Sequence, residues 1–284
     1  ENMTIKQAIE KGAIDLKVGN VDTPKMKARL LMQYVLNQTR QYIIVHDTKV
    51  LNEKEKNEYF SCINKLRTGI PIEHITHQKE FMKLNFFVNE EVLIPRQDTE
   101  ILVEEVIKIA KKINARKILD LCTGSGAIAV SLAKYLPQLE EITALDISHD
   151  AIQIAKKNAI FHKLESKLTF IESNLFENLP QQKYDIIVSN PPYIKRDIMK
   201  RLDKQVQNEP HIALDGGYDG LDFYRRIVKE AYEYLKYGGY LCLEIGYDQK
   251  EDVFKLIEKE HQYSKPYCLK DLCNNDRVVV TKVL

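Results

Sequence analysis

The chain has 284 residues, of which 44% are hydrophobic and 29% are charged, proportions ordinary for a folded globular protein. Its 42 basic and 41 acidic residues leave a net charge of +1, so it lacks the bulk positive field that favours duplex binding. The five scattered cysteines predict a reduced compartment rather than a disulfide framework, and the histidine spacing predicts no metal site. No apolar run reaches the roughly 18 residues of a membrane span, so we expect a cytoplasmic monomer without a membrane partner.

Residues 1–78 have the periodicity of helices. Apolar side chains recur at helical spacing over residues 5–13 and again over residues 28–36, and Pro24 is well placed to begin the second helix. A third helix is predicted to begin near Asn52 and to continue to Leu66. We predict a small helical bundle here and expect it to dock the substrate, because it contains no recognisable catalytic motif.

At residues 79–96 the residue pattern changes from that of helices to that of strands. Two apolar runs, residues 80–88 and 92–96, flank the polar triplet at 89–91, which predicts a β-hairpin that links two domains. Arg96 ends this segment near the expected edge of a sheet, just before a helix predicted over residues 101–113. A surface cation is the ordinary interpretation of such an arginine.

From residue 97 to the end, strand and helix patterns alternate. The predicted strands cover residues 117–121, 142–145, 168–171, 184–189, 240–244 and 277–283, and the predicted helices cover 127–136, 150–161, 223–235 and 249–260. This alternation predicts an α/β fold with a parallel, doubly wound, Rossmann-like sheet, which follows the small helical domain in the chain.

The loop between the first strand and its helix has the character of a cofactor site. Gly124 and Gly126 would let the backbone approach a ligand at the helix N-terminus. Asp146, at the end of the second strand, could accept hydrogen bonds from ribose hydroxyls, and Asn174 and Leu175 lie where an adenine ring would fall. These residues alone fit a nicotinamide dinucleotide as well as S-adenosylmethionine.

The sequence Asn190-Pro191-Pro192-Tyr193 directly follows the strand predicted over residues 184–189. The two prolines hold Asn190 and Pro191 extended or in a turn, so the Asn190 side-chain oxygen and the Pro191 carbonyl can face one planar NH2 group. The Tyr193 ring offers that group an apolar face. Two acceptors would aim the nitrogen at an electrophile, which favours methyl transfer over hydride transfer, although a rigid strand exit would account for the same residues.

These motifs resemble the HemK/PrmC family, class I S-adenosylmethionine-dependent methyltransferases that modify the glutamine side-chain nitrogen in the Gly-Gly-Gln loop of peptide chain release factors. The likeness also runs through residues 93–100, 209–210, 213–221, 243–246 and 276–277. Asn-Pro-Pro-Tyr alone is shared with enzymes that modify adenine in DNA or bases in RNA. The segments around Ile94-Pro95-Arg96 and Ala213-Leu214-Asp215 are the specific signals.

The resemblance implies S-adenosylmethionine as cofactor, S-adenosylhomocysteine as product, and release factors as the protein substrate, with no direct nucleic-acid partner. It implies that Asn190 and the Pro191 carbonyl hold the glutamine amide, that Pro192 belongs to the same catalytic turn, and that Tyr193 shapes its slot. The residues expected to contact the cofactor are Arg96, Cys122, Thr123, Gly124, Ser125, Gly126, Asp146, Asn174, Leu175 and Asn190.

Two positions depart from the family pattern. Cys122 stands where the family usually has glycine, and Asn174 stands where it usually has aspartate. We expect weaker or rearranged cofactor contacts at these positions, with activity retained.

Two other functions fit part of the sequence. A methyltransferase acting on adenine or guanine in DNA or RNA could use the same acceptors, with Tyr193 stacking on a flipped base, but the near-neutral charge disfavours it. A non-catalytic adaptor would need no intact site. The presence of Gly124, Gly126, Asp146 and Asn190 therefore disfavours that alternative.

Overall fold

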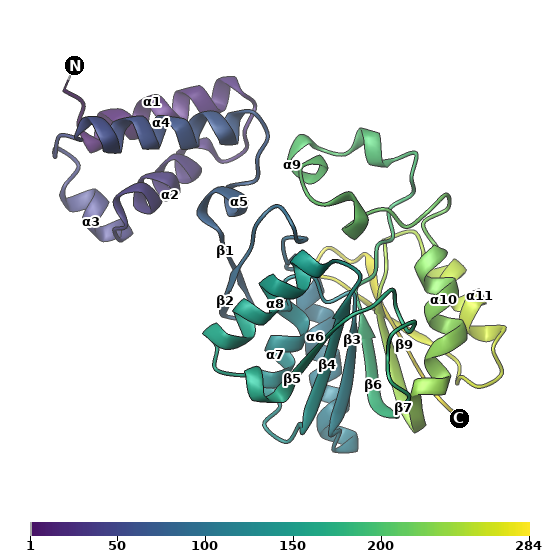
Figure 1. Ribbon diagram of the computed structural model, residues 1–284. Helices are drawn as coiled ribbons and strands as arrows, with labels where there is room; N and C mark the ends of the chain where they lie inside the picture. Colours follow the sequence, from purple (N-terminus) through teal and green to yellow (C-terminus); the bar gives the residue numbers. More distant parts are fainter. Residues whose placement is uncertain (1) are drawn as a thin grey trace. The chain divides into compact units, whose positions relative to one another are not determined.

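The computed structural model describes residues 2–284 and divides the chain into two compact units. The helical unit comprises the chain up to Gln78 together with Asp203–Asn208, and the sheet unit comprises Lys79–Leu202 together with Glu209–Leu284 (Figure 1). Residues 203–208 belong with the helices, which the sequence pattern did not predict. None of the helices within residues 2–284 combines the length and apolar character needed to cross a membrane.

The helical unit is built from α1 (Ile5–Val18), α2 (Pro24–Leu36), α3 (Arg40–Val45), α4 (Glu53–Arg67), α5 (Ile72–Thr76) and α9 (Lys204–Gln207). Thr4 and Asn52 cap α1 and α4, each in a reciprocal pair with the glutamine or glutamate three residues later. The short helices α3, α5 and α9 were not predicted, because fewer than two turns give little periodic signal.

Close helix packing in this unit depends on small residues. A side chain on Gly12 of α1 would place its Cβ 2.5 Å from the Tyr59 hydroxyl oxygen, so glycine lets α1 approach α4. That buried hydroxyl donates to the carbonyl of Ala28, 3.1 Å away. Asn208, just after α9, donates to the Gly69 carbonyl at 2.9 Å and so ties the segment from 203 to 208 to the helices.

The predicted hairpin is present but shorter than expected. Strands β1 (Gln78–Phe81) and β2 (Leu84–Phe87) pair across Met82 and Lys83, whose φ angles of 50° and 59° suit a tight hairpin turn. A turn does form at residues 89–92, where the Val92 amide donates to the Asn89 carbonyl at 3.3 Å. It is not the hairpin turn, however, because residues 92–96 form no strand. The Ile94 amide instead donates to the side chain of Glu209, at 2.8 Å.

A seven-stranded sheet forms the centre of the sheet unit, with strands β3 (Lys117–Leu121), β4 (Glu141–Asp146), β5 (Leu168–Glu172), β6 (Tyr184–Ser189), β7 (Leu235–Glu244), β8 (Tyr267–Lys270) and β9 (Asp276–Lys282). Its order is β5-β4-β3-β6-β7-β9-β8. The α/β class and doubly wound arrangement are confirmed, but an entirely parallel sheet is wrong, because β9 runs antiparallel to both β7 and β8. Strand β8 was missed, and the five residues between β8 and β9 are too few for a parallel crossover.

Helices cover both faces of this sheet (Figure 1). The sheet unit contains α6 (Thr99–Ile113), α7 (Ala127–Tyr135), α8 (His149–Phe161), α10 (Asp222–Ala231) and α11 (Lys250–Glu258), with 3-10 turns at Glu165–Lys167, Met199–Arg201, His211–Ala213 and Tyr232–Tyr234. Buried side chains of α6, α7 and α8 pack against one face, around Ile118, and those of α10 and α11 pack against the other, around Leu119. The helix predicted to reach residue 235 ends at Ala231, since β7 begins at Leu235.

Candidate active site

The carboxyl ends of four neighbouring strands surround a pocket that is partly open to solvent, with about 630 Å³ of empty space when the solvent at its opening is included. Cys122 and Gly124 follow β3, Asp146 ends β4, Asn174 follows β5 and Asn190 follows β6. The strand order reverses between β3 and β6, which is where ligands bind in open α/β sheets. The other lining residues are Glu91, Val92, Leu93, Leu145, Ile147, Ser148, Ala151, Ser173, Leu175, Pro192, Ile212, Ala213 and Phe223.

The loop after β3 brings its backbone close to this pocket. Cys122, Gly124 and Gly126 all have positive φ, at 60°, 55° and 80°. A side chain on Gly126 would place its Cβ 3.0 Å from the Cβ of Ala155, so glycine is needed both for the backbone conformation and for the close approach of α8. Cys122 adopts a left-handed conformation that glycine would adopt without strain.

Asp146 organises the loop through its carboxylate. One oxygen accepts from the Gly124 amide at 2.9 Å, and the other accepts from the Ser148 amide at 3.0 Å. Ser148 caps α8, so Asp146 is not needed for that role. Burial raises the pKa of the Asp146 carboxyl, while bonds from backbone amides oppose that shift. The position of Asp146 at the pocket suits it to accept hydrogen bonds from a ligand.

Asp120 is a functional candidate that the sequence analysis did not single out. Its carboxyl group is fully buried, and one oxygen accepts from the Thr123 hydroxyl at 2.7 Å. Its other oxygen has no hydrogen-bond partner among the described residues. Burial, together with the nearby charge of Asp146, raises the pKa of Asp120 to about 7, against the lowering effect of the Thr123 bond. Strand periodicity alone would have predicted an apolar residue at this position.

The two positions that depart from the family pattern both lie at the pocket. Burial, with the negative charges of Asp146 and Asp120, raises the pKa of the Cys122 thiol, so this thiol is held protonated. The Asn174 side chain accepts from Arg226 at 2.8 Å and donates to Glu177 at 3.2 Å.

The exit of β6 places Asn190 and Pro192 at the pocket, with Asn190 half-buried and Pro192 buried. Both prolyl bonds are trans. The preceding residue, Ser189, is anchored to β3, since its hydroxyl donates to the Leu121 carbonyl at 2.8 Å. The structure therefore presents the Asn190 amide beside the same pocket as Asp146 and Gly124.

Tyr193 is not among the residues that line the pocket. Its hydroxyl donates to Glu244 at 3.1 Å and lies 3.4 Å from Arg277. Its carbonyl accepts from the buried Gln249 side chain at 3.0 Å. The hydroxyl is thus engaged within the protein rather than presented to a ligand.

Six of the predicted site residues do not line the pocket: Arg96, Thr123, Ser125, Gly126, Pro191 and Tyr193. The Arg96 guanidinium forms an ion pair with the buried carboxylate of Glu209 and donates to the Ile94 carbonyl at 3.1 Å. Glu209 also accepts from the Ile94 amide, so this pair fixes the segment that leads back to Leu93 at the pocket.

Several lining residues were not predicted as site residues. Ile212 and Ala213 lie in a 3-10 turn and Phe223 in α10, within the long connection between β6 and β7, and Glu91, Val92 and Leu93 follow the hairpin. The available signal was the family resemblance, which runs through Leu93 and Ala213. Within residues 2–284, no group of three or more histidine, cysteine or acidic side chains is arranged to hold a metal ion.

Comparisons with known proteins agree with this architecture. Residues 96–209 match the methyltransferase small domain family, and residues 7–76 match the PrmC N-terminal domain family. Release factor glutamine methyltransferases of Clostridium acetobutylicum and Clostridium botulinum are 42% and 38% identical over 281 and 280 residues, each covering 98% of both chains. Among solved structures, a methyltransferase from Pyrococcus furiosus shares the fold with a TM-score of 0.52 at 17% identity, over 70% of this chain and 88% of that one. The resemblance predicted from the motifs is confirmed, and the chain belongs to the release factor glutamine methyltransferase family.

Proposed function

We propose that this protein transfers the methyl group of S-adenosylmethionine to the side-chain amide nitrogen of the glutamine in the Gly-Gly-Gln loop of peptide chain release factors. The observation that carries the proposal is the position of Asn190, an amine-orienting acceptor, at the mouth of a pocket that Asp146 also lines. Relatives of that name match the chain over 98% of its length, which supports the choice of substrate.

The charge of the pocket supports S-adenosylmethionine over a dinucleotide. Among the described lining residues, the charged side chains are Glu91 and Asp146, both acidic, with no lysine or arginine to neutralise phosphates. Acidic walls favour a ligand that carries positive charge, as a sulfonium does. Asp120 is buried beneath the same loop, and its ionised form adds further negative charge there. Because its pKa is raised to about 7, that charge is only partly present at neutral pH.

The lining residues divide into polar and apolar surfaces that match the cofactor. Asp146 would accept from the ribose hydroxyls, and the backbone of Cys122 and Gly124 would face the methionine part. Ile147 and Leu175 offer apolar contacts for an adenine ring. Thr123, Ser125 and Gly126 would then act by shaping the loop, and Arg96 by fixing the neighbouring segment through Glu209.

S-adenosylmethionine supplies a methyl group on a positively charged sulfur, which is already an activated electrophile. With the cofactor bound, the Asn190 side-chain oxygen and the Pro191 carbonyl would accept the two hydrogens of the glutamine amide and hold its nitrogen in line with that methyl group. The methyl group would pass from sulfur to nitrogen with S-adenosylhomocysteine as the leaving group, and the extra proton of the product amide would pass to water. Alignment and exclusion of water are the contributions of the protein, so no side-chain base is needed before transfer.

The helical unit is proposed to dock the release factor, since its described residues contribute nothing to the pocket lining. We further propose that the enzyme acts as a monomer in the cytoplasm, where release factors operate. Removal of residues 1–78 should raise KM for the release factor while cofactor affinity is retained. A KM equal to that of the full chain would contradict the docking role.

Transfer of labelled methyl from S-adenosylmethionine to a purified release factor tests the proposal. Two parallel reactions serve as controls, one with a release factor whose Gly-Gly-Gln glutamine is replaced by alanine and one with duplex DNA. We expect label on the wild-type factor alone. Label on DNA would favour the amino-methyltransferase of nucleic acids, and absence of label everywhere would favour the adaptor.

A further inference from the structure

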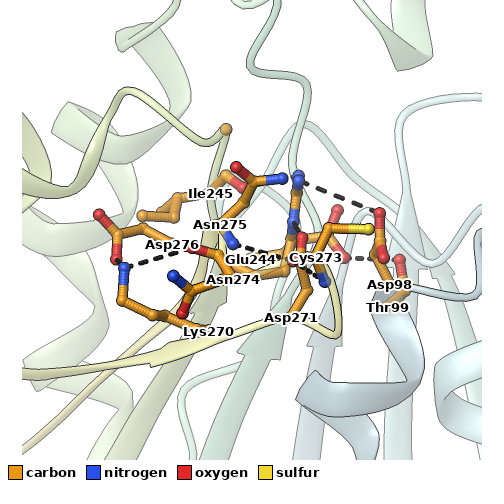
Figure 2. A network of polar contacts seen from close by, with 12 residues as sticks. Asp98, Thr99, Glu244, Ile245, Lys270, Asp271, Cys273, Asn274, Asn275 and Asp276 are labelled. Carbon is orange, nitrogen blue, oxygen red and sulfur yellow. Dashed lines mark hydrogen bonds and ion pairs between the residues drawn. The ribbon is translucent and has the colours of Figure 1, made fainter.

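A buried polar cluster lies behind the exit of β6. Its centre is Glu244, the last residue of β7. Only 2% of the surface of this residue is exposed to solvent. One carboxylate oxygen accepts from the Thr99 hydroxyl at 2.5 Å, and the other accepts from the Tyr193 hydroxyl at 3.1 Å. Figure 2 shows Glu244 beside Thr99 and Asp98, with the turn that follows β8 close by. Both oxygens of a single carboxylate therefore connect the start of α6 to the exit of β6.

Arg277 of β9 completes the cluster. Its guanidinium donates to Asp271 at 3.1 Å and to the Ile245 carbonyl at 3.2 Å, and it lies 3.4 Å from the Tyr193 hydroxyl. Asp271 is in turn fixed by the amides of Cys273 and Asn275, at 2.9 and 3.0 Å. The Tyr193 hydroxyl therefore accepts from the Arg277 guanidinium and donates to the Glu244 carboxyl group, whose pKa burial raises to about 7. These two contacts restrict the orientation of the ring.

The backbone of Tyr193 is fixed as firmly as its hydroxyl. Gln249 donates to the Tyr193 carbonyl at 3.0 Å and accepts from the Gly246 amide at 2.8 Å. A side chain on Gly216 would place its Cβ 2.7 Å from the Tyr193 Cα, and one on Gly220 would lie 2.6 Å from the Tyr193 carbonyl oxygen. These two glycines let neighbouring backbone enclose Tyr193, so the residue cannot shift without displacing them.

The position of Tyr193 determines that of the amide acceptors. Only two prolines separate Tyr193 from Asn190, and a proline ring fixes φ, so few rotations can absorb a displacement. At the other side, Ser189 is tied to β3. The Asn190 oxygen and the Pro191 carbonyl thus lie between two residues, Ser189 and Tyr193, whose positions are fixed. The position of Tyr193 depends on side chains that are distant in the sequence.

We propose that Glu244 is a positioning residue for methyl transfer, acting through the Tyr193 hydroxyl to hold the acceptors of Asn190 and Pro191 in their working orientation. Glu244 does not line the pocket, so its effect on the cofactor should be small. The inference rests on the proposed function, since it assumes that Asn190 and Pro191 hold the glutamine amide.

Glu244→Gln tests this role because it keeps the volume of the side chain but cannot accept from Thr99 and Tyr193 at both positions. We expect kcat to fall about 10- to 100-fold, with the Kd for S-adenosylmethionine within about twofold of wild type. Asp185→Asn is the matched control. It removes a carboxylate from the opposite end of β6, where Asp185 accepts from the amides of Arg116 and Lys117, and should lower Tm while leaving kcat unchanged.

A double-mutant cycle separates positioning from general stability. Tyr193→Phe should lower kcat with cofactor affinity retained, and adding Glu244→Gln to it should cause little further loss, because the shared contact is already absent. Fully additive losses in kcat would overturn the proposal. Should Glu244→Gln fail to fold, Tyr193→Phe keeps the test decisive, since an unchanged kcat in that variant would overturn the proposal equally.

Failure of this inference can be told apart from failure of the proposed function. If wild-type enzyme methylates the release factor and Asn190→Ala does so slowly, the function and the amide acceptors stand. A Glu244→Gln variant as fast as wild type would then overturn the positioning role alone. Absence of methylation by the wild-type enzyme would instead overturn the proposed function, and with it the premise of the inference.

Discussion

The two loops that meet at the pocket are stabilised in different ways. The loop from residue 120 to 126 is held by its own neighbours, through the bond from Thr123 to Asp120 and through the Asp146 carboxylate on the next strand. The exit of β6 is held by three side chains that are distant in the sequence, those of Glu244, Gln249 and Arg277. The loop from 120 to 126 depends on its own residues and the adjacent strand, and it forms a surface for the cofactor. The exit of β6 depends on contacts that form only when the sheet is complete, and it positions a group of the substrate. Variants of the two loops should therefore affect different kinetic constants.

The largest effect is expected at the amide acceptor. Asn190→Ala removes the side-chain oxygen that orients the glutamine nitrogen, so kcat should fall by about 10²- to 10³-fold. The Kd for S-adenosylmethionine, measured by calorimetry, should change far less. Equal losses in kcat and in cofactor affinity would contradict the division between the two loops.

On the cofactor side, Asp146→Asn should weaken S-adenosylmethionine binding. The amide has one acceptor where the carboxylate has two, so the bonds to Gly124, Ser148 and the ribose cannot all form. Lost bonds to a charged group cost about 1.5–3 kcal/mol, or roughly 10- to 100-fold in Kd. Glu172→Gln, an exposed carboxylate at the end of β5, is the control and should leave Kd unchanged.

A smaller effect, on stability, is expected from Gly126→Ala. The new side chain would have to adopt a positive φ of 80°, and its Cβ would lie 3.0 Å from the Cβ of Ala155. We expect the free energy of unfolding to fall by about 1–3 kcal/mol. Gly238→Ala is a matched control, because Gly238 has a similar φ of 72° with nothing within 4 Å of the added Cβ. Equal destabilisation of the two variants would show that the contact with α8 contributes nothing.

Stability should also depend on pH through Asp120. Burial raises its pKa from 3.8 to about 7, so the unfolded chain ionises at lower pH than the folded chain. The contribution of this group to the free energy of unfolding is therefore present below about pH 4 and is lost as pH rises through about 7. Asp120→Asn removes the ionisation, so the Tm of the variant relative to that of wild type should rise between about pH 4 and pH 7 and level off above that range. A difference in Tm that is constant with pH would contradict this account.

The smallest effect is expected at the two positions that depart from the family pattern. Cys122→Gly would relieve a left-handed backbone conformation, and Asn174→Asp would place a carboxylate beside Arg226. Together they should tighten S-adenosylmethionine binding by about 0.5–1 kcal/mol, a few-fold in Kd. Unchanged affinity in both single variants would contradict the expected weakening at these positions.

Features encoded by neighbouring residues could be predicted from the sequence. The alternation of strands and helices predicted the α/β class, and Cys122, Gly124, Asp146, Asn174 and Asn190 all line the pocket, whereas Thr123, Ser125 and Gly126 do not. Their placement follows from one rule, since each stands at or just beyond the carboxyl end of a parallel strand.

Features that depend on distant contacts could not be predicted. Glu244 and Arg277 have no recognisable local role, and their partners Thr99 and Tyr193 lie 145 and 84 residues away. Strand β8 is only four residues long, and β9 is antiparallel because of the short turn before it. Arg96 has the sequence context of a ligand contact, yet Glu209 engages its guanidinium.

The single-turnover rate of methyl transfer at saturating S-adenosylmethionine tests the central claim most directly, measured for Asn190→Ala and Asp146→Asn beside wild type. Saturation compensates for weakened cofactor binding but cannot restore a lost orientation of the glutamine nitrogen. We predict that the rate of Asp146→Asn recovers to near the wild-type value, whereas that of Asn190→Ala stays low. Recovery of Asn190→Ala, or failure of both variants to recover, would contradict the separation of cofactor binding from amide positioning.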